Sequence, residues 1–133
     1  MFMISRLVSL SGLCGLLILG GCVESHGHIV SQNWVDRPGR PTMHFLNTPS
    51  EADGLAVYPR SAFDAGVEGS AYVQCRFTET GGFDQCVVLE ETPASHAFGD
   101  GALRVMTYYR WDPAAYPEMI GKPARQRVWF RMR

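Results

Sequence analysis

Two cysteines that flank a glycine turn constrain the fold of this chain more than any other feature of its sequence. Alternating residues from Ser70 to Thr78 predict a strand, and residues 83–91 predict a second one. The turn between them contains Gly81 and a second glycine, which accept positive φ angles. A hairpin centred there places Cys75 directly opposite Cys86, with Cα atoms about 4.5–5.5 Å apart, within the range for a disulfide. The sequence therefore predicts a disulfide-linked antiparallel hairpin.

The second strand of this hairpin carries a predicted irregularity. Phe83, Cys86 and Val88 are all apolar, but Phe83 and Cys86 are three positions apart and cannot share one face of a regular strand. We therefore expect a β-bulge near Asp84-Gln85 that turns all three side chains toward the core. A redox-active or metal-binding pair is the alternative to a structural disulfide, although the spacing of the two cysteines is unlike the usual zinc patterns.

The first 21 residues predict a lipoprotein signal peptide. A single basic residue, Arg6, precedes an apolar run that is shorter than the roughly 20 residues needed to span a bilayer. Leu19-Gly20-Gly21 leads into Cys22 and resembles a bacterial lipobox, in which the signal is cut before an acylated cysteine. An uncut signal anchor and an ordinary cleaved signal are the alternatives.

Acylation of Cys22 would anchor the mature chain to a membrane that it does not span. Val23 follows in place of the aspartate that signals retention in the inner membrane, so we expect the periplasmic side of the envelope and favour the outer membrane. Cys14 leaves with the signal, and Cys75 and Cys86 remain as an even pair in an oxidising compartment.

The mature chain is predicted to consist of a flexible tether, residues 22–54, and one domain, residues 55–133. Prolines and glycines interrupt the first segment, and no periodic apolar face emerges there. The formal net charge of −1 lacks the basic excess that nucleic-acid binding requires. We therefore expect an anchored single domain that does not bind nucleic acid.

The domain outside the hairpin is predicted to contain two helices and two further strands. Leu55–Tyr58 suits a short strand, and Arg60–Ala65 suits a short helix that ends at Gly66. A second helix is expected from His96 to Trp111, with Ser95 as its N-cap. Its apolar face, by helical spacing, consists of Phe98, Ala102, Val105, Met106 and Tyr109.

The terminal strand, Arg125 to Met132, alternates between an apolar and a basic face. Val128, Phe130 and Met132 are predicted to face the core. The other face is basic, with one exposed aromatic side chain. It is either a solvated face whose charges guard a sheet edge or a contact surface for a protein partner or cell-wall polymer. Its candidate partner-binding residues are Arg127, Trp129 and Arg131.

Residues 58–133 together resemble the C-terminal domain of the TonB energy-transducer family, and the TolA C-terminal domain has a similar architecture. The shared pattern consists, in order, of Tyr58-Pro59, Ala62, Gly66, Glu68-Gly69, the Val73/Cys75/Phe77 alternation, Gly82, Val88, Ala102-Leu103, Val105, Trp111, Pro113-Ala114, Gly121-Lys122-Pro123 and the terminal strand. The resemblance implies an α+β fold: a small antiparallel sheet of about three strands plus a short N-terminal strand, with two helices on one face.

The resemblance also implies a docking function. Domains of this family bind an extended segment of an outer-membrane transporter by adding it to a sheet edge. This chain keeps the docking end, but its short leader and tether differ from the membrane helix and proline-rich spacer of a transducer. We expect a lipoprotein that docks a protein partner by strand addition and is linked to energy-dependent outer-membrane transport. The alternative is a structural or assembly lipoprotein with no transport role.

An enzyme is not expected. No Gly-x-Ser-x-Gly nucleophile motif occurs, and the four histidines are scattered. His26 and His28 could bind a metal ion only weakly, because two ligands on a flexible segment make a poor site. The sequence thus predicts no catalytic residue, no metal site and no cofactor.

Overall fold

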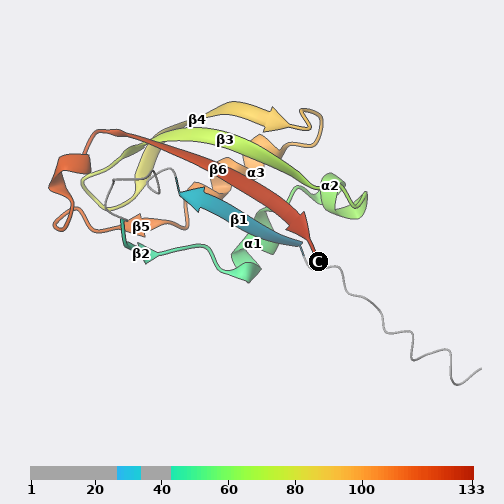
Figure 1. Cartoon of the computed structure of the whole chain (residues 1–133), viewed down its shortest axis with the longest axis horizontal. Coiled ribbons are helices and arrows are strands. Elements are labelled where there is room, and N and C mark those ends of the chain that lie inside the picture. Colours follow the sequence, from blue (N-terminus) through green and yellow to red (C-terminus); the bar gives the residue numbers. More distant parts are fainter. Residues whose placement is uncertain (1–26, 34–42) are drawn as a thin grey trace, which may run out of the picture.

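The computed structural model describes residues 27–33 and 43–133. Its main element is a four-stranded antiparallel sheet, in the order β1 (Gly27–Asn33), β6 (Pro123–Met132), β3 (Gly69–Phe77) and β4 (Phe83–Thr92). Helices lie against one face of this sheet (Figure 1). The predicted α+β class is therefore confirmed. The predicted signal peptide and Cys22 lie outside the described residues.

Within the described residues, three helices and a small second sheet accompany the main sheet. Helix α1 (Glu51–Val57) packs beneath β1, and α3 (Phe98–Met106) packs beneath β3 and β4. The short helix α2 (Arg60–Asp64) lies at the end of the sheet where the chain terminates (Figure 1). Other short elements are β2 (Phe45–Asn47), which pairs with β5 (Arg110–Trp111), and a 3₁₀ turn, Pro117–Met119.

The prediction of a flexible tether up to residue 54 is wrong for the described residues. Strand β1 pairs with β6 along its whole length, and the register runs from Gly27 opposite Met132 to Asn33 opposite Gln126. The partner strand lies at the other end of the sequence, so local periodicity in this segment could not reveal the pairing. The folded unit therefore includes residues that were assigned to the tether.

Leu55–Tyr58 is not a strand, because residues 51–57 form helix α1. Its N-terminus carries a capping box, in which the Asp53 N–H donates to Ser50 Oγ at 3.2 Å and the Ser50 N–H donates to the Asp53 carboxylate at 2.8 Å. These bonds satisfy backbone donors that a helix start otherwise leaves unpaired. The Ser-x-x-Asp spacing was visible in the sequence and is the signal that the strand prediction overlooked.

The predicted helix 96–111 is shorter at both ends. Helix α3 begins at Phe98, with Ala97 and not Ser95 as its N-cap residue. It ends at Met106 because Arg110–Trp111 pairs with β2 as a strand. The Trp111 indole N–H donates to the Gly82 carbonyl at 3.0 Å, which joins this strand to the hairpin turn.

The core between α3 and the sheet is built on aromatic side chains. Phe98, Phe130 and Tyr58 form a mutual cluster, with ring centroids 5.2–6.0 Å apart. Phe77 meets Trp111 edge-on at 5.0 Å. All five residues of the predicted helical face are buried, as are Val128 and Phe130 of the terminal strand, while Met132 is half-buried. The predicted inward faces are therefore largely confirmed.

Gly81→Ala is expected to destabilise the fold more than Gly66→Ala. Both glycines have positive φ angles, +85° and +68°, where alanine costs about 1–2 kcal/mol. At Gly81 a Cβ would also lie 2.7 Å from the Trp111 carbonyl oxygen, whereas at Gly66 no described atom lies within 4 Å. Urea unfolding of the two variants measures the difference. Equal losses would show that the hairpin turn yields to the added methyl group.

Candidate functional site

Strand β4 forms one edge of the four-stranded sheet and is exposed along its middle. It pairs with β3 on one side, and within residues 27–33 and 43–133 no strand pairs with its other side. Val87, Val88 and Leu89 are 50%, 38% and 50% exposed, which is unusual for three consecutive apolar residues. The edge therefore offers unpaired backbone groups next to apolar side chains.

Two bulges shape this edge. The register shifts between Gln74 and Arg76, where Cys75 faces both Gln85 and Cys86, and Gln85 has a positive φ of 49°. This confirms the bulge predicted near Asp84-Gln85. A second shift, which was not predicted, leaves Leu89 without a partner residue on β3. A bulge inserts one extra residue and bends its strand, so Leu89 adds to the exposed apolar run.

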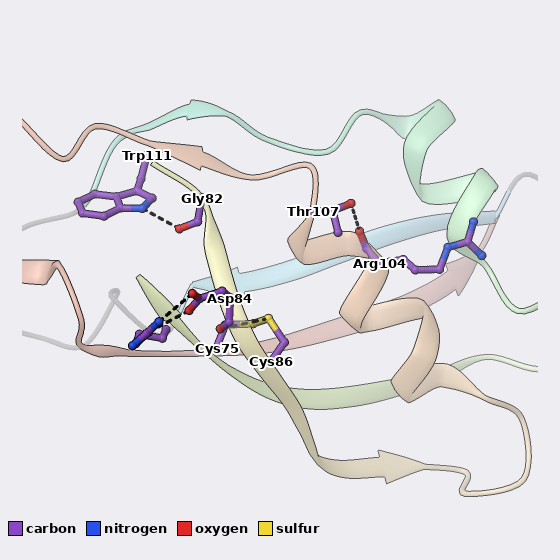
Figure 2. Close-up of a disulfide and its surroundings, with 8 residues drawn as sticks. Cys75, Gly82, Asp84, Cys86, Arg104, Thr107 and Trp111 are labelled. Atoms are coloured by element: carbon purple, nitrogen blue, oxygen red, sulfur yellow. Dashed lines mark hydrogen bonds and ion pairs between the residues drawn. A yellow bond between two sulfur atoms is a disulfide. The ribbon is translucent and has the colours of Figure 1, made fainter. Parts of the chain in front are cut away.

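The predicted disulfide between Cys75 and Cys86 is present (Figure 2). Their Cα atoms are 4.0 Å apart, closer than the separation expected for regular opposed residues. Cys75 is buried and Cys86 is half-buried, and both lie on the helix-facing side of the hairpin. The bond therefore attaches the edge strand covalently to the central strand at the first bulge.

Helix α3 packs against the inner face of β4. The Gly99 N–H donates to Glu91 Oε2 at 2.8 Å, and this glycine lies so close to β4 that a Cβ would meet the Val88 methyl groups at 3.0 Å. Together with the disulfide, this contact holds the inner face of the edge strand. The outer edge of β4 is thus fixed in position and remains available for pairing.

A hollow of about 530 Å³ adjoins the start of β4. It lies between the hairpin turn and the end of α3, and both apolar and polar side chains line it. The lining residues are Thr78, Thr80, Gly82, Phe83, Asp84, Met106, Thr107 and Arg110. A chain that continued along the β4 edge would pass over this hollow.

Two acidic residues of the hairpin, Asp84 and Glu90, are engaged in ion pairs on the helix-free face of the sheet. Asp84 accepts two hydrogen bonds from Arg76 at 2.8 and 2.9 Å, and Glu90 accepts two from Arg127 at 3.1 Å. The hydrogen bonds from Arg76 and Arg127 lower the pKa values of Asp84 and Glu90. Neither acid therefore stands as a free charge along the edge.

The candidate partner-binding residues Arg127, Trp129 and Arg131 do not guard an edge, because β6 lies between β1 and β3. Arg127 lies 5.1 Å from the Tyr72 ring centroid, and Arg131 lies 4.8 Å from that of Trp129. Trp129 was expected to be exposed but is half-buried, and its indole nitrogen has no hydrogen-bond partner in the described part of the chain. These three residues therefore form a stacked layer across the middle of the sheet.

The charges of this layer are largely neutralised. Arg131 pairs with Glu68 at 3.3 Å, and the Met132 N–H donates to the same carboxylate at 2.7 Å. Arg127 pairs with Glu90 at 3.1 Å, and Arg125, beside this layer, donates to the uncharged side chain of Gln74 at 2.7 Å. Because its arginines have local partners, the layer is better suited to stabilise the surface of the sheet than to bind an anion.

The residues of the family motif occupy structural positions. The Tyr58 hydroxyl donates to the Val67 carbonyl at 2.8 Å, and Pro59 is the N-cap residue of α2. Gly66 follows that helix, and Gly69 opens β3 against the Phe98 ring. Pro113 packs against Gly81 at the turn. These five residues therefore stabilise the end of the sheet and the hairpin, whereas Val88, which also belongs to the shared pattern, lies on the exposed edge.

The described residues provide no group of three or more side chains suited to hold a metal ion. In the same part of the chain, no helix has both the length and the apolar character needed to cross a bilayer. A scan of the sequence against protein-family models finds no match, and a search of curated proteins finds no significant similarity. A function is therefore inferred from the geometry of the β4 edge and from the resemblance of residues 58–133 to TonB-type domains.

The ion pairs of the hairpin predict a loss of stability in acid. Because the folded-state pKa values of Asp84 and Glu90 are lowered, their contribution is complete above the unfolded values and disappears as the pH falls through the folded ones. Urea unfolding from about pH 5 to about pH 2 should show a smaller decline for the D84N/E90Q variant than for the parent chain. Parallel declines would mean that other groups carry the acid sensitivity.

Proposed function

We propose that this chain is an envelope lipoprotein, acylated at Cys22, whose β4 edge binds an extended segment of another protein by strand addition. The observation that carries the proposal is the unpaired β4 edge with its exposed run Val87–Leu89. In strand addition, backbone hydrogen bonds supply affinity, and alternate side chains supply specificity. We therefore propose that this protein is a binding module and not an enzyme.

Natural proteins usually protect such an edge with charges, prolines or a covering segment. In the part of the chain that the structure describes, no proline lies along the middle of β4 and no strand pairs with its outer side. Its acids Asp84, Glu90 and Glu91 are already engaged with Arg76, Arg127 and the backbone of α3. An unprotected apolar edge risks aggregation unless it has a partner. Retaining this edge in a rigid form is the property expected of a docking site.

The proposed partner is the periplasmic segment of an outer-membrane transporter, and the proposed location is the periplasmic side of the envelope. This choice follows the resemblance of residues 58–133 to TonB-type domains, which bind such segments. The β4 strand precedes α3 and follows the glycine turn, so it lies on the hairpin that carries much of the resemblance. The proposal concerns docking alone and does not include coupling to a proton-driven motor.

The alternative role, structural or assembly, predicts an edge that is covered or strongly charged. The arginines expected to supply that charge face outward on the central strand β6 and are paired with Glu68, Glu90 and Gln74. The apolar character of β4 therefore favours docking over this alternative.

The proposal is tested by placing lysines on the β4 edge, where their charges should block strand addition. In the full chain purified in detergent, V87K/L89K is expected to weaken binding of peptides from the periplasmic segments of the cell's own outer-membrane transporters by at least about tenfold, since edge lysines oppose strand pairing. Leu46→Lys is the matched control, because Leu46 is 70% exposed on β2, away from this edge. Fluorescence anisotropy with labelled peptides measures the affinity.

The parent chain and L46K should bind alike and saturably. The proposal fails if no transporter peptide saturates the parent chain, or if V87K/L89K binds as tightly as L46K. Circular dichroism of each variant checks that the lysines leave the fold intact.

A further inference from the structure

The position of β1 limits how far the folded unit can lie from Cys22. Only four residues separate Cys22 from Gly27, and Gly27 already belongs to the sheet through its pairing with Met132. Five fully extended residue steps span at most about 18 Å. A chain acylated at Cys22 therefore cannot place Gly27 further than that from its anchor, although the whole segment 22–54 was expected to act as a flexible tether.

The pairing register shows which end of the domain is near the anchor. Gly27 lies opposite Met132, Phe130 lies opposite Gly69, and Ser70 lies opposite Thr92. The start of β1 thus lies at the same end of the sheet as the end of β4, with α2 alongside (Figure 1). We call this end, formed by Gly27, α2, Glu68 and Met132, the anchor pole. The hairpin turn lies at the opposite end.

Three exposed arginines at and beside the anchor pole are paired with acids: Arg60 with Asp64, Arg131 with Glu68 and Arg133 with Glu51. Gly27 itself is buried against the rings of Tyr58 and Phe63, so the connection to the anchor leaves the domain from a firmly packed point. This end can therefore rest near lipid headgroups.

The same geometry limits where the docking edge can reach. The β4 strand has ten residues, and at about 3.3 Å per residue it extends about 33 Å from the anchor pole. Added to the connection of about 18 Å, the far end of the edge lies within about 50 Å of the bilayer. The exposed run Val87–Leu89 lies about halfway along β4.

We propose that the anchor pole faces the bilayer that holds Cys22, and that the β4 edge receives a segment from a protein of that same membrane. This inference rests on the proposed function and on acylation of Cys22. It deepens the proposal by restricting the partner: its segment must be presented within about 50 Å of the surface to which the lipoprotein is attached. A partner embedded in an opposing membrane does not meet this condition by itself.

The orientation is tested with the acylated full chain in liposomes that carry a headgroup-attached acceptor dye. A donor fluorophore is placed through an unnatural amino acid at Ser61, on α2, or at Glu79, at the hairpin turn; both residues are exposed. Transfer from position 61 should clearly exceed transfer from position 79. Insertion of about 30 Gly/Ser residues between His26 and Gly27 should lower both and remove most of the difference.

The partner is tested in cells by a photo-crosslinking residue at Val87, followed by membrane fractionation and mass spectrometry. The expected product is an integral or lipid-anchored protein of the membrane that contains this chain, and it should disappear with Leu89→Lys but persist with Leu46→Lys. Equal transfer from positions 61 and 79, absence of acylation at Cys22, or a crosslinked partner that is soluble or belongs to the other membrane would overturn the inference.

These outcomes are separable from failure of the docking function. A soluble partner whose crosslink disappears with Leu89→Lys would overturn the membrane placement and leave strand addition intact. Correct orientation combined with loss of all edge-dependent binding would contradict docking and leave the placement intact.

Discussion

Replacing Phe98 with alanine is expected to lower the free energy of unfolding by about 3–5 kcal/mol. Phe98 is fully buried where α3 meets the sheet, and its ring packs against Tyr58 and Phe130. The backbone of Gly69 approaches the ring so closely that it forms one wall of its pocket. A rigid wall of this kind cannot collapse into the space left by the ring, so most of the cavity cost should remain.

Urea unfolding followed by circular dichroism measures this loss, and Leu46→Ala is its control. Leu46 is 70% exposed, so its truncation should change stability by less than about 0.5 kcal/mol. A loss for F98A of under about 1 kcal/mol would contradict the packing described here. Because small domains are stable by only about 5–15 kcal/mol, the expected change is large enough to unfold much of the protein under mild conditions.

Removing the disulfide with C75A/C86A is expected to cost about 3 kcal/mol, because the cross-link closes a loop of about a dozen residues and so restricts the unfolded chain. The two cysteines are 11 positions apart in the sequence. Reduction of the parent chain should produce a similar loss, and a reductant should have no further effect on the double variant. Thermal or urea unfolding with and without reductant measures both effects.

The disulfide variant also separates stability from docking. The bond joins β4 to β3 at the first bulge, and β4 is also held on its inner face by α3 and by the contacts of Phe83 with Phe45 and Phe77. If C75A/C86A retained full stability, the disulfide would contribute nothing beyond the hydrogen bonds of the hairpin. The variant could instead be less stable and still bind transporter peptides at low temperature. The disulfide would then stabilise the folded domain without being needed for the binding conformation of the β4 edge.

Local patterns predicted the features that depend on neighbours in the sequence. The hairpin followed from strand alternation, the glycine turn and the opposed cysteines, and the bulge followed from the spacing of Phe83 and Cys86. The buried face of α3 followed from helical periodicity, because residues three and four apart share one side of a helix. The capping box of α1 was equally local, and the strand prediction for Leu55–Tyr58 failed because it was overlooked.

The candidate site depended on relations that no local pattern contains. Alternation along β6 correctly separated Val128 from Arg127, but it could not show that β1 pairs with β6 and moves β6 away from the edge. Val88 was predicted to face the core, and it does lie against Gly99, yet it remains 38% exposed because β4 has one neighbouring strand. The identity of the edge strand is a property of the whole sheet.

The resemblance to TonB-type domains implied the α+β class. Side-chain periodicity and turn chemistry over short spans of chain predicted that Cys75 meets Cys86 and which sides of the hairpin, of α3 and of β6 face inward. That residues near Gly27 join the sheet, that β6 is central and that β4 is the open edge became apparent in the three-dimensional structure. Pairing between distant strands depends on backbone hydrogen bonds, which every residue except proline can donate, so the sequence carries little record of which strand will be the neighbour.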